Sequence, residues 1–180
     1  LAACCADADT KTLRVFILAG QSNMEGADSK VKDINRYPPF AGLNMPQDKV
    51  LFSYAIGREQ KQTSKGWVAL QPVGNLVGPE LSFARRVSQE TGAPIAIIKC
   101  AAGGTTLGGD WNPDEPSGFK LYPLALELVQ SSLAELDRRK VPYRIEGFMC
   151  LPPQEEKLVI TTAGIVQLGE LLAQSYLEHR

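Results

Sequence analysis

Residues 13–26 read LRVFILAGQSNMEG, an apolar run that stops at Gly20 and is followed two positions later by Ser22. A continuous apolar run after a charged lead-in is typical of a strand that is buried on both faces. We therefore expect a strand over residues 13–19 and a turn into a helix after it. A serine in such a turn is either a nucleophile or a helix cap, and the residues alone leave both interpretations open.

The rest of the chain alternates apolar runs with amphipathic segments. The predicted strands are 13–19, 50–56, 94–100 and 145–151. The predicted helices are 79–91, 121–140 and 161–179. Residues 27–48 and 57–78 are polar and punctuated by glycine or proline, so they are predicted to be long loops. This alternation predicts an α/β fold, a three-layer α/β/α sandwich with a central parallel sheet.

The composition is that of an ordinary globular chain and excludes several classes of function. The chain has 180 residues, of which 44% are hydrophobic, and a net charge of −1. We expect a single domain over residues 11–180. The scattered basic residues give no basis for nucleic-acid binding. No apolar run is long enough for a membrane span, and no motif indicates a metal or organic cofactor.

The first ten residues, LAACCADADT, have the small residues of a signal-peptide cleavage region. We interpret them as the remnant of an export signal, with a disordered tail as the alternative. The export interpretation predicts a secreted or periplasmic protein. Leu-Ala-Ala-Cys also resembles a lipoprotein box, in which Cys4 would carry a lipid anchor.

Cys100 and Cys150 each end an apolar run. Their spacing, and that of Cys4 and Cys5, is not the spacing of a zinc site. We expect buried free thiols at both positions. A disulfide between Cys100 and Cys150 requires the two strand ends to meet.

Three candidate segments fall where predicted strands end: Ser22, Gly103-Gly104, and the residues after Leu151. Sites in parallel α/β sheets lie at the carboxyl ends of strands, so these segments are predicted to converge. Acyl transfer needs an exposed nucleophile and backbone amides that accept an oxyanion, which such turns supply. An ordinary glycine turn is the alternative for Gly103-Gly104.

In order and spacing these segments resemble the SGNH hydrolases, and within them the sialate O-acetylesterase-like domains, a carbohydrate esterase family that includes acetylxylan esterases. The matching segments are 15–26, 78–84, 97–107, 158–164 and 167–169, with Trp111 downstream of the third. The resemblance covers about residues 13–150 well and 158–178 in outline, and GQSNM is its most specific part. It implies a flavodoxin-like SGNH hydrolase fold and an acetylated carbohydrate, of sialate or xylan type, as substrate.

Carried over residue by residue, the resemblance implies that Ser22 is the nucleophile. It implies an oxyanion hole made by the amides of Ser22 and Gly104, or Gly103 if the register shifts by one. The implied substrate-binding residues are Gln21, Asn23, Glu80, Gly103, Thr105 and Trp111. Trp67 and Trp111 are expected either to stack on sugar rings or to pack in the core.

The family pattern continues with Trp-x-Gln-Gly-Glu, whose glutamine supports the oxyanion, and with Asp-x-x-His, which supplies the base. In this chain Gln154 aligns with that glutamine, Glu156 with the aspartate and Val159 with the histidine. One short stretch thus replaces two family segments, so at least one strand and one helix of the pattern are missing near the C-terminus. The resemblance leaves Gln154 and Glu156 as catalytic candidates.

Valine cannot accept a proton, and the chain has one histidine, His179. The predicted helix before His179 would place it about 25 Å from the strand ends, against a hydrogen-bond reach of about 3 Å. Glu155 or Glu156 is therefore the candidate base, with a solvated loop as the alternative. The resemblance implies a carbohydrate acetylesterase. The alternatives are a catalytically inactive carbohydrate-binding remnant and a structural or interaction domain of the same shape.

Overall fold

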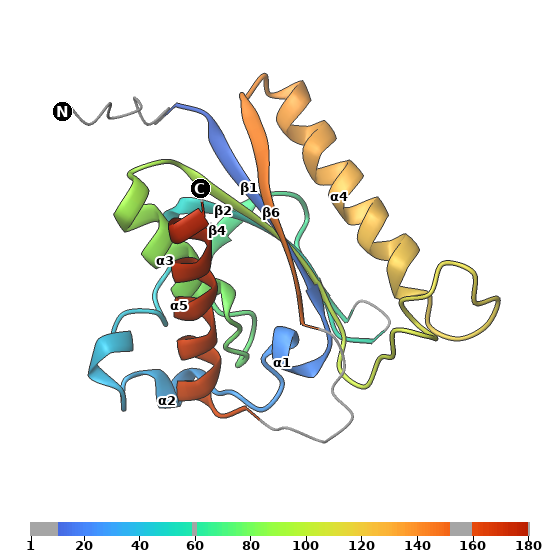
Figure 1. The fold of residues 1–180 in the computed structure, drawn as a ribbon, viewed down its shortest axis with the longest axis horizontal. Helices are drawn as coiled ribbons and strands as arrows, with labels where there is room; N and C mark the ends of the chain where they lie inside the picture. Colours follow the sequence, from blue (N-terminus) through green and yellow to red (C-terminus); the bar gives the residue numbers. More distant parts are fainter. Residues whose placement is uncertain (1–10, 59–60, 152–159, 180) are drawn as a thin grey trace.

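The computed structural model describes residues 11–58, 61–151 and 160–179, which form a sheet flanked by helices (Figure 1). The strands are β1 (Leu13–Gly20), β2 (Gln47–Ile56), β3 (Gln62–Thr63), β4 (Val68–Leu70), β5 (Ile95–Ala101) and β6 (Tyr143–Leu151). The helices are α1 (Ser22–Glu25), α2 (Val31–Ile34), the 3₁₀ helix η1 (Pro38–Phe40), α3 (Glu80–Thr91), α4 (Leu121–Arg138) and α5 (Thr162–His179). The four predicted strands and three predicted helices are all present within a few residues of their expected bounds.

Within the described residues the sheet has the order β3-β2-β5-β1-β6, and β4 also pairs with β2. The four long strands are parallel to one another, as predicted. The short strands β3 and β4 run antiparallel to β2 at one side of this parallel core, so the sheet as a whole is mixed. These two strands lie inside residues 57–78, the segment predicted to be a loop. They are too short to carry the apolar periodicity from which strands are recognised.

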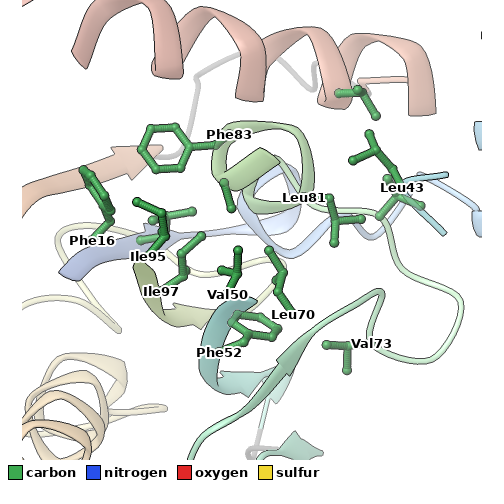
Figure 2. Close-up of a cluster of buried hydrophobic side chains, with 14 of the residues drawn as sticks. Phe16, Leu43, Val50, Phe52, Leu70, Val73, Leu81, Phe83, Ile95 and Ile97 are labelled. Carbon is green, nitrogen blue, oxygen red and sulfur yellow. The ribbon is translucent and has the colours of Figure 1, made fainter. Parts of the chain in front are cut away.

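The helices cover the two faces of the sheet, α3 and α5 on one and α4 on the other (Figure 1). Between the sheet and the α3–α5 layer, Phe16 packs edge-on against Phe83 and Tyr176, with ring centroids 4.9 Å apart in each pair. Figure 2 shows Phe16 and Phe83 in this layer, with Ile95 and Ile97 beside them. This α/β/α arrangement agrees with the predicted fold class.

The α4 layer encloses a smaller core that includes Val15, Ile98, Leu136 and Trp67. Trp67 is buried and its indole N–H donates to the Ser132 carbonyl at 3.0 Å. Of the two interpretations for this tryptophan, the structure supports core packing.

The α4 layer leaves part of the sheet uncovered. The side chains of Ile145 and Phe148 on β6 are 52% and 64% exposed. Phe148 and Cys150 border an apolar groove of about 380 Å³ between β1, β6 and α4. Among the described residues β6 is an edge strand. An exposed apolar edge is consistent with the prediction that a strand and a helix of the family pattern are missing after β6.

Cys100 and Cys150 lie on opposite sides of β1, since each pairs with Ala19. Two strand spacings separate them by about 9.5 Å, which exceeds the roughly 7 Å that a disulfide can bridge. Both are free thiols. Cys100 is buried as predicted, whereas the prediction that Cys150 is buried is wrong, because Cys150 lies on the exposed edge strand.

Burial raises the pKa of the Cys100 thiol to about 12, so this thiol stays protonated and unreactive through pH 9. We expect iodoacetamide at pH 9 to alkylate the exposed Cys150 of the native protein and to spare Cys100. Peptide mass mapping of native and urea-unfolded samples measures both sites. Equal labelling of the two cysteines in the native protein would contradict the burial of Cys100.

Candidate active site

The first part of the candidate site is the turn that joins β1 to α1. A Cβ atom at Gly20 would lie 2.7 Å from the Leu151 carbonyl oxygen and 2.8 Å from the Met24 Cβ, so the position requires glycine. Ser22 then opens α1, a single helical turn. Gly26 ends the turn with φ +86°, and its N–H donates to the Ser22 carbonyl. The two glycines thus hold Ser22 just beyond the carboxyl end of β1.

The second part is the end of β5, which runs beside β1 with Gly20 opposite Ala101. The Ala102 N–H donates to the Gly20 carbonyl at 3.2 Å, which extends the pairing past the strand ends. A Cβ atom at Gly103 would lie 3.6 Å from the Ser22 Cβ. The predicted convergence of Ser22 with Gly103 is therefore confirmed. Leu151, at the end of β6, pairs with Gly20. The third predicted segment, the residues after Leu151, begins outside the described part of the chain.

The Ser22 side chain is half-buried, and its hydroxyl donates to Gln21 Oε1 at 3.3 Å. Asn23 is buried beside it in α1. Gln21 and Asn23, two of the implied substrate-binding residues, thus flank Ser22 in the turn.

Glu25, three residues after Ser22 in α1, reaches across to the second strand end. Its Oε2 accepts the Gly103 N–H at 2.5 Å, a short charge-assisted hydrogen bond. Within the described residues the Gly104 N–H has no such acceptor, and Gly104 adopts φ +70°. Sequence reasoning missed Glu25, although its i, i+3 spacing from Ser22 places the two on one helical face.

Hydrogen bonds and an ion pair hold the loop after Gly104, both to Arg58 just after β2 and within the loop. Arg58 Nη1 donates to the Gly104 carbonyl at 3.2 Å, and Arg58 Nη2 lies 3.6 Å from Asp110 Oδ1. The buried Thr105 hydroxyl donates to the Ala102 carbonyl at 2.7 Å. Sequence reasoning also missed Arg58 and Asp110, because an exposed arginine in a predicted loop gives no local signal.

Trp111 is half-buried and packs against the buried cluster of Ala55, Cys100, Ala102 and Leu121. It also lines the apolar groove beside β1. Trp111 therefore both contributes to packing and faces an open surface.

A buried ion pair lies beneath the serine turn. Lys99 Nζ on β5 is 2.7 Å from Glu80 Oε2 at the start of α3, and their side chains are 1% and 2% exposed. The same Nζ lies 3.5 Å from the Glu25 carbonyl oxygen. A Cβ atom at Gly78 would overlap both charged groups, so glycine is required there. Glu80 and Thr105, which were expected to bind substrate, thus make contacts inside the fold.

His179 lies at the far end of α5 from the site. The first turn of α5 adjoins the chain after α1, where the Lys30 N–H donates to the Thr162 hydroxyl oxygen at 2.9 Å. The helix then runs to His179, about 25 Å away at 1.5 Å per residue. The His179 ring instead hydrogen-bonds the Ser175 carbonyl at 2.7 Å. The prediction that His179 lies far from Ser22 is confirmed.

Gln154, Glu155, Glu156 and Val159 lie outside the described residues. Among the residues that the structure describes, no cluster of His, Cys, Asp or Glu has the form of a metal site. In the same part of the chain, no helix is long and apolar enough to cross a membrane.

Lys99→Met would leave the Glu80 carboxylate buried without its partner. Breaking a buried pair in this way typically costs about 3–5 kcal/mol of unfolding free energy. We expect a loss of that size in urea unfolding, and partial recovery in the double variant with Glu80→Gln, which removes the orphaned charge. A Lys99→Met protein that loses under about 1 kcal/mol would show that the pair does not hold the turn in place.

The chain is similar to several known proteins. A sequence model of the family described as "Carbohydrate esterase, sialic acid-specific acetylesterase" matches residues 12–149. A protein from Arabidopsis thaliana of known X-ray structure superposes with a TM-score of 0.55 at 20% identity, over 92% of this chain and 98% of that one. A carbohydrate acetylesterase from Xanthomonas citri superposes with a TM-score of 0.50 at 16% identity, over 78% of this chain and 32% of that one. A search of curated proteins returns no match.

Proposed function

The chain belongs to the carbohydrate esterase family of sialic acid-specific acetylesterases, and from this membership we propose that it is a serine esterase that removes O-acetyl groups from carbohydrates. The observation that carries the proposal is the position of Ser22 in a glycine-bounded turn beside Gly103. This turn brings a hydroxyl nucleophile and backbone amides to one point, which is the requirement for acyl transfer.

In the proposed reaction Ser22 Oγ attacks the carbonyl carbon of the acetyl ester. The carbonyl oxygen becomes an oxyanion, which accepts hydrogen bonds from the amides of Ser22 and Gly104. The tetrahedral intermediate then expels the sugar oxygen, which leaves as a hydroxyl after taking a proton, and Ser22 stays acetylated. Water attacks the acetyl-enzyme in the same way, releasing acetate and restoring Ser22. Gly104 suits the oxyanion role better than Gly103, since the Gly103 amide is occupied by Glu25.

The Ser22 proton must pass to a base in the first step. We propose Glu156 as that base and Gln154 as a further support for the oxyanion, on the family pattern and on the distance of His179. A carboxylate is a weaker base than a histidine near neutral pH. We therefore expect slow turnover that rests largely on binding and on the oxyanion hole.

For the substrate we propose an acetylated carbohydrate, of sialate or xylan type. Gln21, Asn23 and Gly103 surround Ser22 and are the proposed contacts to the acetyl group. Trp111, which lines the apolar groove, is the proposed contact to a sugar ring. Glu80 and Thr105 would support the site from below, through the Lys99 pair and the Ala102 carbonyl.

A second candidate function is carbohydrate binding without catalysis. The observation that favours it is the placement of the chain's one histidine at the far end of α5. If the protein only binds carbohydrate, sugar binding measured by calorimetry is unchanged in Ser22→Ala. The unaltered protein then hydrolyses no ester. Absence of binding to any plain or acetylated oligosaccharide would exclude it.

We also propose that the protein is exported. The carbohydrate substrate and the signal-like composition of residues 1–8 support this proposal, with Cys4 as the candidate for a lipid anchor. These residues lie outside the part of the chain that the structure describes.

Ser22→Ala removes the proposed nucleophile. We expect the unaltered protein to hydrolyse p-nitrophenyl acetate and acetylated sugars slowly, and the variant to lose most of that rate. Released acetate and p-nitrophenolate measure the two reactions. Ser175→Ala, at an exposed serine on α5, is the matched control and should keep the full rate. Equal rates for the unaltered protein and Ser22→Ala would rule out Ser22 as the nucleophile.

A further inference from the structure

The amide proposed for the oxyanion belongs to the peptide group between Gly103 and Gly104. The peptide group before it is held at both ends: the Gly103 N–H donates to Glu25, and the Ala102 carbonyl accepts from Thr105. The peptide group after it is held through its carbonyl, since the Gly104 oxygen accepts from Arg58 at 3.2 Å. The Gly103–Gly104 peptide thus lies between two fastened neighbours.

Two consecutive glycines form the most adaptable backbone available. Gly104 adopts φ +70° with no atom within 4 Å of a Cβ placed on it, so its own surroundings do not restrict it. Fixing one residue's backbone costs about 1–2 kcal/mol of conformational entropy, and glycine costs most. The contacts that hold the flanking peptide groups therefore determine where the Gly104 N–H points.

These contacts also tie the Gly104 amide to the serine. Glu25 and Ser22 lie in the same helical turn, so the hydrogen bond to Gly103 couples the position of the nucleophile to the glycine loop. Arg58 is itself anchored, by Asp110 at 3.6 Å and by the Phe119 ring, whose centroid lies 5.5 Å from the guanidinium carbon. Glu25 thus belongs to α1, and Arg58, just after β2, is held by two further side chains.

We propose that Glu25 and Arg58 are positioning residues that orient the Gly104 amide toward the oxyanion formed on Ser22. Neither residue touches the reacting atoms. The proposal rests on the proposed function, because it assumes acyl transfer at Ser22. In this proposal, the side chains of Glu25 and Arg58 fix the orientation of the Gly104 N–H.

Kinetics test the effect on the reaction. Glu25→Ala should lower kcat for acetyl ester hydrolysis about 10- to 100-fold and leave KM within about 2-fold, since loss of one oxyanion donor costs about 100- to 1000-fold. Glu25→Gln keeps an acceptor oxygen and should stay within about 5-fold of the unaltered protein. Arg58→Ala should lower kcat, and Arg58→Lys should recover part of the loss. Asp28→Ala and Lys65→Ala, at exposed charged positions, are the matched controls.

Nuclear magnetic resonance of protein labelled with ¹⁵N-glycine tests the geometry without any turnover. Glu25→Ala should move the amide signals of Gly103 and Gly104 and speed Gly103 exchange with solvent at least about tenfold, whereas Glu25→Gln should not. Arg58→Ala should move the Gly104 signal.

The two measurements separate the positioning proposal from the proposed function. Suppose that the protein is inactive, that Glu25→Ala moves the Gly104 amide signal, and that Glu25→Gln leaves this signal in place. This result supports the positioning role of Glu25 and contradicts the proposed esterase function. An active protein in which Glu25→Ala keeps full kcat contradicts positioning. An unmoved Gly104 signal in both Glu25→Ala and Arg58→Ala overturns it with or without activity.

Discussion

The parallel pairing of β1 with β5, in the register that places Gly20 opposite Ala101, is the constraint on which the candidate site depends. Both strands are buried on both faces, so a slip of one residue would drive every side chain to the wrong layer. With this register fixed, the chain leaves β1 toward Ser22 and leaves β5 toward Gly103 at the same edge of the sheet. The proximity of Ser22 and the Gly103-Gly104 amides thus follows from the register of two buried strands.

Close contacts then turn this proximity into a defined geometry. Glycine at position 20 allows the β6 carbonyl and α1 to approach the end of β1 together. The buried Lys99–Glu80 pair links β5 to the start of α3 and also reaches the Glu25 carbonyl. Burying such a pair costs free energy of desolvation. Removing one partner costs more stability, because it leaves a lone charge in the interior. The buried Lys99–Glu80 pair beneath the serine turn therefore has few alternative arrangements.

The long elements could be predicted from the sequence because each carries a strong apolar run or helical periodicity. The short strands β3 and β4 could not, since they depend on pairing with β2. Ser22 and the two glycines were recognisable from motif and strand ends together. Glu25 and Arg58 were not, because their roles arise from contacts between segments distant in sequence. The exposure of Cys150 was missed for a related reason: the run that contains it is apolar, and only the topology shows that it forms an edge.

The central claim is that Ser22 is a nucleophile whose hydroxyl attacks an electrophile held by the neighbouring amides. The most direct measurement is reaction of the full chain with a fluorophosphonate probe, followed by peptide mass spectrometry. The phosphonyl group is tetrahedral and uses the same oxyanion site, and its adduct does not turn over. We expect a single adduct, on Ser22. An unlabelled Ser22 in protein that hydrolyses acetyl esters, or an adduct on another serine, would contradict the claim.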